Sequence, residues 1–284
     1  MRRLHILKGE LNLSSILVAE DLSAVGGISL SAAVPVLTAL QYDVAALPTS
    51  LLSTHTSGYG RPAVVDLADW LPRVFQHWTQ AQLNFDAALI GYVGSVELCQ
   101  QLTTYLTEQP LALLVVDPVL GDLGELYSGF DQHYVEAMRQ LIRHADVILP
   151  NVTEASLLTG RPYTSQPDLA ATLRALATLM GPKGHAVITD AVQDDQIGCA
   201  WLDETGQVAF VGQPRLPGHY NGTGDVLAAV IAGLLGRGFS LTRSLELASQ
   251  WLNLAVAETL AQHRSDPRQG IALGALLRAI LTVD

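Results

Sequence analysis

The segment Leu111-Ala112-Leu113-Leu114-Val115-Val116 is followed at once by Asp117-Pro118-Val119-Leu120-Gly121-Asp122. A strand that is apolar at every position is expected where helices cover both faces of a parallel sheet. In such sheets, ligands bind beyond the carboxyl ends of the strands, which is where Asp117 stands. This stretch therefore predicts a parallel sheet covered by helices on both faces, with a site at the edge formed by the carboxyl ends of its strands.

The rest of the chain repeats this alternation of strand-like and helix-like runs. Strands are predicted at 15–19, 44–47, 85–90, 146–149 and 186–189, and a hairpin is predicted from 199–202 and 208–211. Helices are predicted at 26–40, 66–81, 96–106, 133–144, 154–158, 168–180, 225–235, 241–262 and 271–281, the first with Pro35 inside it. We expect an α/β fold of three αβα layers, with a mainly parallel central sheet and helices on both faces, and a single domain over 1–284.

Composition excludes several classes of protein. Of the 284 residues, 49% are hydrophobic and 15% charged, which favours a compact globular chain over a disordered one. The net charge of −11 argues against a nucleic-acid partner. Cys99 and Cys199 form no Cys-x-x-Cys pair, so we expect two reduced thiols and no thiolate zinc site. The longest apolar run, 226–235, is too short to cross a membrane. We expect a cytoplasmic protein without a membrane partner.

The strongest local motif is Asn221-Gly222-Thr223-Gly224-Asp225, which directly precedes that apolar run. The glycines allow a tight turn, and the amides at a helix start can bind an anion. Such an anion hole suits the charge that develops on a transferring phosphoryl group, and Asp225 could accept a proton there. The alternative is that Asp225 is an N-cap beside a simple turn, and the local sequence alone slightly favours it. P-loop and dinucleotide glycine patterns are absent.

Two more polar clusters follow predicted strands. Asp117 could hold Mg²⁺, usually through water, or could simply start a turn. Pro150-Asn151-Val152-Thr153-Glu154 opens a helix, and its Glu could organise metal-bound water or only serve the helix cap. Each cluster is ambiguous when taken alone. Because both clusters and the glycine motif all follow strands, together they favour a phosphate-handling site.

These motifs resemble the pyridoxal kinase branch of the ribokinase-like superfamily, over nearly the whole chain. Gly222, Thr223, Gly224 and Asp225 are similar to the anion hole and catalytic base of that superfamily. Asp117-Pro118-Val119 with Gly121, and Pro150-Asn151 with Glu154, resemble its metal and phosphate segments. The resemblance implies that ATP and its phosphates are bound by four residues: Asp117, Asn151, Glu154 and Thr189. It assigns Mg²⁺ to Asp117 and Glu154, through water.

The substrate end of the family is also matched. Ser53-Thr54-His55-Thr56 resembles the segment beside the pyridine ring, and Gly91-Tyr92-Val93-Gly94-Ser95 resembles a segment whose Tyr borders the substrate. Asp21-Leu22-Ser23-Ala24-Val25-Gly26 is similar to the loop after the first strand. The resemblance implies substrate contacts from five residues: Asp21, Ser23, His55, Thr56 and Tyr92. Without it, His55 would be an ordinary loop histidine and Ser23 a turn residue.

The implied activity is ATP-dependent phosphorylation of the 5′-hydroxymethyl group of pyridoxal, pyridoxamine or pyridoxine. ATP and Mg²⁺ are the implied cofactors, a requirement for K⁺ is left open, and a homodimer is expected. Asp225 would accept the hydroxyl proton, as a weak base because the helix dipole favours its charged form.

Two departures keep alternatives open. Many pyridoxal kinases carry Ser in place of Asp21, and 21–28 also resembles the loop of hydroxymethylpyrimidine kinases, although those usually carry Cys in place of Asp225. The segment 213–220, which in the family covers the nucleotide, is short. The alternatives are a hydroxymethylpyrimidine or sugar kinase on the same fold, a non-catalytic B6- or nucleotide-binding protein, and a scaffold protein. The stripe of Trp70 and Trp78 is assigned to packing, with His77 facing solvent.

Overall fold

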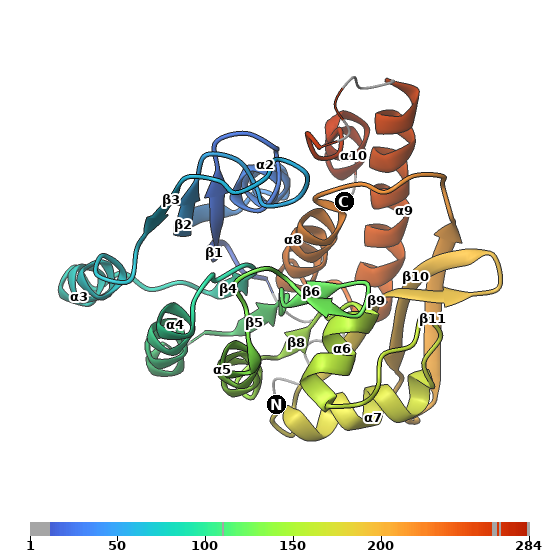
Figure 1. The fold of residues 1–284 in the computed structure, drawn as a ribbon, viewed down its shortest axis with the longest axis horizontal. Helices are drawn as coiled ribbons and strands as arrows, with labels where there is room; N and C mark the ends of the chain where they lie inside the picture. Colours follow the sequence, from blue (N-terminus) through green and yellow to red (C-terminus); the bar gives the residue numbers. More distant parts are fainter. Residues whose placement is uncertain (1–11, 110, 263–265, 267, 283–284) are drawn as a thin grey trace.

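A nine-stranded sheet forms the centre of the computed structural model, which describes residues 12–109, 111–262, 266 and 268–282. Its strands lie in the order β11-β10-β9-β8-β5-β4-β1-β2-β3, and β6 pairs with β7 in a separate small hairpin (Figure 1). The strands are β1 (Ser15–Ser23), β2 (Asp43–Leu52), β3 (Val64–Asp66), β4 (Ala87–Ile90), β5 (Leu113–Val116), β6 (Gly121–Asp122), β7 (Glu125–Leu126), β8 (Val147–Ile148), β9 (His185–Gln193), β10 (Gln196–Leu202) and β11 (Val208–Pro214).

The strands from β2 through β1, β4, β5 and β8 to β9 are parallel, whereas β3, β10 and β11 are antiparallel to their neighbours. The predicted mainly parallel sheet and the predicted β10–β11 hairpin are therefore confirmed. Consecutive residues of β5 alternate between two cores: Leu113 and Val115 face one, and Leu114 and Val116 the other. This double burial explains why the strand is apolar throughout.

Helices cover both faces of the sheet (Figure 1). One face carries α2 (Leu30–Ala39), α8 (Thr223–Gly236), α9 (Leu241–Ala261) and α10 (Gly274–Ile280). The other carries α3 (Leu71–Gln80), α4 (Val96–Glu108), α5 (Gln132–Ile142), α6 (Val152–Thr159) and α7 (Leu169–Leu179). The three αβα layers are thus as predicted, and the single domain over 1–284 stays a prediction.

The register brings the strand ends to one edge of the sheet. Ala19 of β1 pairs with Ile90 of β4, Ile90 pairs with Val116 of β5, and Val116 pairs with Ile148 of β8. The residues that follow these strands therefore lie side by side. The chain runs from β1 outward to β2 and later returns to β4 on the other side of β1, and ligands bind at such a switch point.

Three boundaries differ from the sequence prediction. β1 continues to Ser23, so two of the predicted substrate residues lie on a strand and not in a loop. Helix α2 begins at Leu30 and runs through Pro35. Residues 64–66 form the edge strand β3, and α3 begins only at Leu71, because Pro72 suits the first turn of a helix but not its interior.

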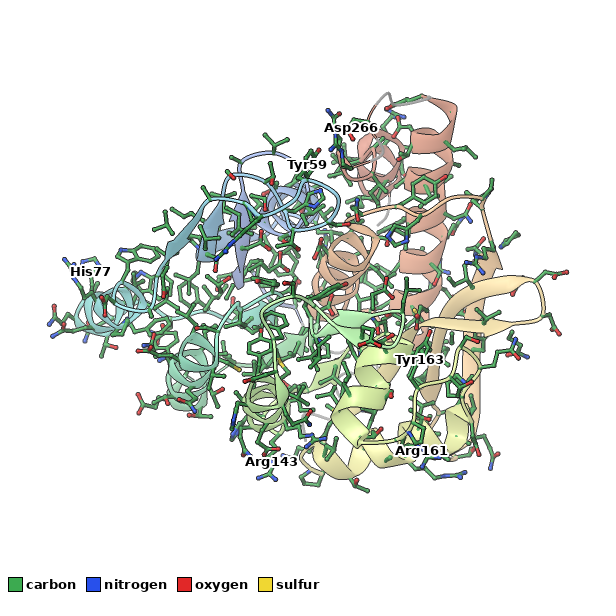
Figure 2. The ribbon with its side chains drawn as sticks, viewed as in Figure 1. Tyr59, His77, Arg143, Arg161, Tyr163 and Asp266 are labelled. Atoms are coloured by element: carbon green, nitrogen blue, oxygen red, sulfur yellow. The ribbon has the colours of Figure 1, made fainter. Side chains whose placement is uncertain are left out.

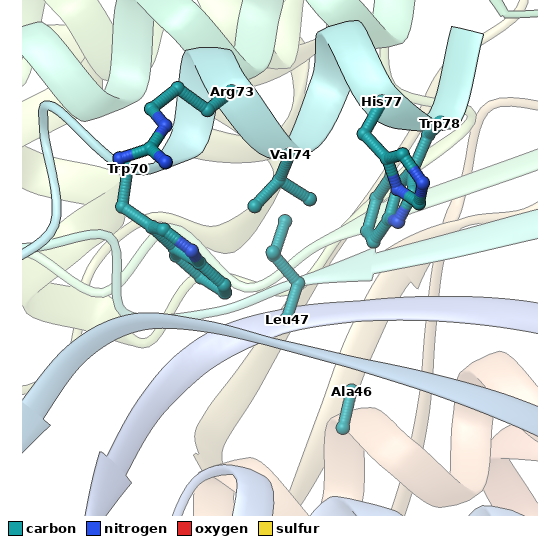
Figure 3. Close-up of a pocket in the computed structure, with 7 residues that line it drawn as sticks. All are labelled: Ala46, Leu47, Trp70, Arg73, Val74, His77 and Trp78. Atoms are coloured by element: carbon teal, nitrogen blue, oxygen red, sulfur yellow. The ribbon is translucent and has the colours of Figure 1, made fainter. Parts of the chain in front are cut away.

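The tryptophan stripe is only partly a packing feature. Trp78 contacts Phe75, Phe85 and Tyr105 in the core, as predicted, and His77 is exposed. Trp70, however, is 40% exposed, so its assignment to packing was wrong. It lines a groove of about 420 Å³ between α3 and β2, together with Ala46, Leu47, Arg73, Val74, His77 and Trp78 (Figure 3). In the described part of the chain, no helix combines the length and apolar character that crossing a bilayer requires.

Candidate active site

The N-terminus of α8 carries the glycine motif. Gly222 is the N-cap residue, with a left-handed φ of 84°, and no side chain caps this helix end. A Cβ at Gly222 would lie 2.9 Å from Cγ2 of Ile28, so a larger residue would also collide. The first amides of a helix have no partner within it, and here they stay available to an anion. Asp225 lies in the first turn and is not the N-cap, so the capping alternative is wrong.

The carboxylate of Asp225 is held from the opposite side of the site. The backbone N–H of Ser29 donates to its Oδ2 at 3.0 Å, across a sequence separation of 196 residues. Ser29 has a φ of 49°, a conformation that non-glycine residues adopt only when their surroundings enforce it. Burial, and secondarily the charge of Asp21, raise the pKa of Asp225 to about 6. The expected weak base is thus corrected: burial outweighs the helix dipole, and the carboxylate binds a proton more readily than an exposed aspartate.

Asp117 faces the same helix end from β5. A Cβ at Gly224 would lie 3.6 Å from Oδ2 of Asp117, so the glycine leaves the space in front of this carboxylate open. Burial and the charge of Asp225 raise the pKa of Asp117 to about 8. Within the described residues, no group donates a hydrogen bond to its carboxylate. A bound cation would compensate this buried charge.

Glu154 is buried and fully occupied by the backbone. Its Oε1 accepts from the N–H of Leu120 at 3.1 Å, and its Oε2 accepts from the N–H of Asn151 at 2.8 Å. The Asn151 side chain in turn accepts from the N–H of Glu154 at 2.8 Å, which completes a capping box on α6. The capping alternative is therefore correct for these two residues, and any contact of Glu154 with a metal would run through water.

Two further carboxyl groups at this edge were missed by the sequence analysis. Asp190, in β9 beyond its parallel pairing with β8, accepts from the N–H of Val152 at 2.7 Å, and burial raises its pKa to about 6. Its neighbour Thr189, predicted near the nucleotide, is half-buried and donates its N–H to the carbonyl of Pro150. The other is Glu20, 1% exposed, whose Oε2 has no hydrogen-bond partner among the residues that the structure describes.

Glu20 is positioned by a glycine. A Cβ at Gly91 would lie 2.8 Å from both Cγ and Oε1 of Glu20, so the side chain can lie over β4 only because residue 91 has none. Burial raises the pKa of Glu20 well above its usual value, and the charges of Asp225, Asp21 and Asp117 raise it further. The sequence signal that could have identified it is a charged residue at the end of an apolar strand.

The predicted substrate residues gather near the end of β1, with the exception of Thr56. Ser23 donates to Oδ2 of Asp21 at 2.8 Å, and burial raises the pKa of Asp21. The pKa of Tyr92 is raised by burial and, secondarily, by the charge of Asp21. Thr56 is exposed, and its hydroxyl has no partner among the described residues.

His55 is 2% exposed and has no free ring nitrogen. Its Nδ1 accepts from the N–H of Ser57 at 3.1 Å, and its Nε2 lies 2.6 Å from the carbonyl oxygen of Arg268. This pattern requires the neutral tautomer with the proton on Nε2. In this conformation, His55 joins the loop after β2 to the main chain at Arg268, and its contact with a substrate stays a prediction.

Comparisons with known proteins agree with this geometry. Residues 26–267 match the phosphomethylpyrimidine kinase family model. The crystal structure of pyridoxal kinase from Lactobacillus plantarum is 73% identical, with a TM-score of 0.93, and covers 95% of this chain and 97% of that one. A putative phosphomethylpyrimidine kinase from Bacteroides thetaiotaomicron, crystallised with pyridoxal, is 34% identical with a TM-score of 0.87, and 95% and 96% of the two chains are covered.

A curated relative extends the similarity to a more distant sequence. The pyridoxal kinase PdxY of Rubrobacter xylanophilus is 33% identical over 262 residues, which cover 85% of this chain and 86% of the relative. The family model begins at residue 26, so it includes Asp117, Asn151, Glu154 and Asp225 but neither Asp21 nor Ser23. The chain therefore belongs to the family of phosphomethylpyrimidine and pyridoxal kinases, within the ribokinase-like superfamily.

Proposed function

We propose that this protein transfers the γ-phosphoryl group of ATP to the 5′-hydroxymethyl group of pyridoxal, pyridoxamine or pyridoxine. One observation carries the proposal: a half-buried carboxylate, Asp225, lies in the first turn of a helix whose leading amides have no side-chain cap. This arrangement supports the assignment of a base beside an anion site. The 73% identity to pyridoxal kinase from Lactobacillus plantarum supports the choice of substrate.

Asp225 acts on the nucleophile. It accepts the proton of the substrate hydroxyl while the hydroxyl oxygen bonds to the γ-phosphorus and ADP leaves. Its pKa of about 6 means that it is ionised at neutral pH and still basic enough to take a proton. The N–H of Ser29 fixes the direction of the carboxylate, and amides of Gly222 to Asp225 stabilise the charge on the phosphoryl oxygens.

The acidic residues of the site fit a magnesium ion. Asp117 offers a buried carboxylate without a hydrogen-bond donor among the described residues, which is the hard oxygen ligand that Mg²⁺ prefers. Glu154 would orient metal-bound water, since both of its oxygens already accept hydrogen bonds from backbone amides. When bound, Mg²⁺ would neutralise phosphate charge during transfer. Asn151 and Thr189 complete the predicted nucleotide side.

The vitamer would lie between the end of β1 and the segment after β4. Asp21 and Ser23 form a hydrogen-bonded pair suited to the polar edge of a pyridine ring, and the charge of Asp21 raises the pKa of Tyr92. His55 and Thr56 would border the ring from the loop after β2. The burial of His55 supports a role in shaping this end of the site.

Hydroxymethylpyrimidine is the second candidate substrate. The family model that matches carries the name phosphomethylpyrimidine kinase, and the segment from Asp21 to Ile28 resembles the loop of those enzymes. Asp225 favours the vitamer, because the pyrimidine enzymes usually carry Cys at this position.

A cytoplasmic homodimer is part of the proposal. Cys99 and Cys199 are buried free thiols, in keeping with a reducing compartment. The edge strand β3 exposes Val64 and Val65 by 59% and 53%, and exposed apolar edges favour pairing with a second copy. Light scattering during gel filtration tests the dimer, which a monomer mass at micromolar concentration would refute.

The proposed activity is tested by incubating the protein with ATP, Mg²⁺ and each of the three vitamers, and identifying the product by mass spectrometry. We expect ADP and one vitamer phosphate in equal amounts. ATP binding without any vitamer phosphate would favour the binding-protein alternative.

A further inference from the structure

The side chains of Tyr59, Asp266 and Arg268 form a cluster, here called the clasp, where the segment after α9 meets the loop of residues 53–63. Figure 2 shows Tyr59 and Asp266 next to one another. Arg268 donates from Nε and Nη2 to the two carboxylate oxygens of Asp266, at 2.7 and 2.9 Å. Its guanidinium carbon lies 4.3 Å from the centre of the Tyr59 ring, and Nη1 donates to the carbonyl of Gly58 at 3.1 Å.

An ion pair at this position would be weak by itself, since the Arg268 side chain is 44% exposed. The clasp is stronger than such a pair because one planar guanidinium combines a two-pronged ion pair, ring stacking and a backbone hydrogen bond. Only Arg can make all three contacts at once. The guanidinium of Arg268 thus joins the loop 53–63 to Asp266, in addition to the main-chain contact between Arg268 and His55.

The main chain of the same segment continues the connection inward. The Arg268 carbonyl binds the ring of His55, and the same ring fills the space beside Gly26, where a Cβ would overlap it. A Cβ at Gly270 would lie 2.6 Å from the carbonyl oxygen of Gly26. These contacts leave no room for one segment to shift without the others.

The connection ends at the catalytic base. Gly26 belongs to the turn that leads to Ser29, and the N–H of Ser29 holds Asp225. A displacement of the 53–63 loop would therefore be transmitted to the substrate end of the site and to the base. Because the vitamer binds only when the loop is in place, the base is correctly positioned in the bound complex, so displacement lowers the affinity for the vitamer and not kcat.

We infer that Arg268 is a positioning residue, which keeps the 53–63 loop in the arrangement that receives the vitamer. This inference rests on the proposed function. Without the guanidinium, the loop populates that arrangement in a smaller fraction of molecules, and the apparent affinity for the vitamer falls by the same fraction. ATP binding, on the other side of the site, is unaffected.

The kinetic test compares Arg268→Ala and Arg268→Lys with a matched control, Arg278→Ala. Arg278 also forms an exposed ion pair, but its partner is Glu258 of α9, at 3.3 Å, and not a residue of the clasp. We expect the vitamer KM to rise about tenfold in Arg268→Ala, less in Arg268→Lys, and not in the control. The KM for ATP and kcat should stay within about twofold. An unchanged vitamer KM, or equal rises in both KM values, would overturn the inference.

A second measurement does not depend on activity. Hydrogen exchange of backbone amides in 53–63 is compared in ligand-free wild type, Arg268→Ala and Arg278→Ala. We expect exchange about tenfold faster in Arg268→Ala only, because the amide of Ser57 is protected by the His55 ring. If no vitamer is phosphorylated by wild type, the proposed function fails, and this exchange still decides whether the clasp holds the loop. Equal exchange rates in all three proteins would refute the inference that Arg268 holds the 53–63 loop.

Discussion

Replacing the base by its uncharged analogue, Asp225→Asn, should remove activity and at the same time stabilise the ligand-free protein. Ionising Asp225 in the folded state is costly, since burial raises its pKa from 3.8 to about 6. Such a shift corresponds to about 3 kcal/mol for a fully buried group. Because Asp225 is only half-buried, solvent screening reduces this to about 1–2 kcal/mol.

The sign of this effect follows from proton linkage. Below pH 3.8 the carboxyl is neutral in both the folded and unfolded states, so the charge costs nothing. As the pH rises from 3.8 through 6, the unfolded state loses its proton first, and wild type loses stability that the Asn variant keeps. The difference is therefore complete above pH 6. Asn can still accept from the N–H of Ser29, so the geometry of the site is retained.

The assay is thermal unfolding of both proteins at pH 4 and pH 8, with EDTA and without nucleotide. At pH 8 we expect the melting temperature of Asp225→Asn to exceed that of wild type by roughly 2–8 °C, and at pH 4 the two should agree. Turnover should fall by about 10²- to 10⁴-fold, as for loss of a general base. The exposed Asp69→Asn should change neither quantity. A variant that is less stable at pH 8, or equally shifted at both pH values, would refute the buried-charge reasoning.

Two other substitutions test the architecture of the site. Gly222→Ala places a side chain at a φ of 84° and 2.9 Å from Ile28. We expect the free energy of unfolding, measured in urea, to fall by about 1–2 kcal/mol and kcat to fall at least about tenfold. Wild-type values of both quantities would contradict the left-handed turn. Asn151→Ala removes the acceptor for the N–H of Glu154 and the donor to the carbonyl of Gly121, so we expect it to lower the free energy of unfolding by about 2 kcal/mol. Asn151→Ser keeps a helix cap and should lower it by about half as much. Equal losses in the two variants would show that the cap contributes nothing.

The local sequence pattern was sufficient to predict the helices and strands whose apolar residues follow a clear pattern. The apolar run of β5 predicted a sheet buried on both faces, and the glycines before α8 predicted an open helix start. Both depend on residues close in sequence. Edge strand β3 was not predicted. Val64 and Val65 were assigned to no element and Asp66 to the start of a helix, because so short an apolar run cannot be identified as a strand until its partner β2 is known.

The site was predicted less completely than the fold, since its contacts join distant residues. Nothing near Ser29 indicates that its N–H holds Asp225, and nothing near Arg268 indicates that its carbonyl binds His55. The prediction that Asp225 is a weak base was wrong for the same reason. The helix dipole, which lowers the pKa of Asp225, can be inferred from the sequence, whereas its burial, which raises the pKa, cannot. Glu20 was missed because its surroundings come from β1, β4 and α8 together.

The substrate and the role of Asp225 are tested together by comparing kcat/KM for pyridoxal and hydroxymethylpyrimidine at saturating ATP and Mg²⁺, with the phosphate located in each product by ³¹P NMR. We predict that pyridoxal is preferred, that its phosphate is on the 5′-oxygen, and that Asp225→Asn abolishes the reaction. Preference for the pyrimidine, or a pyridoxal phosphorylation rate that is the same in wild type and Asp225→Asn, would contradict this prediction.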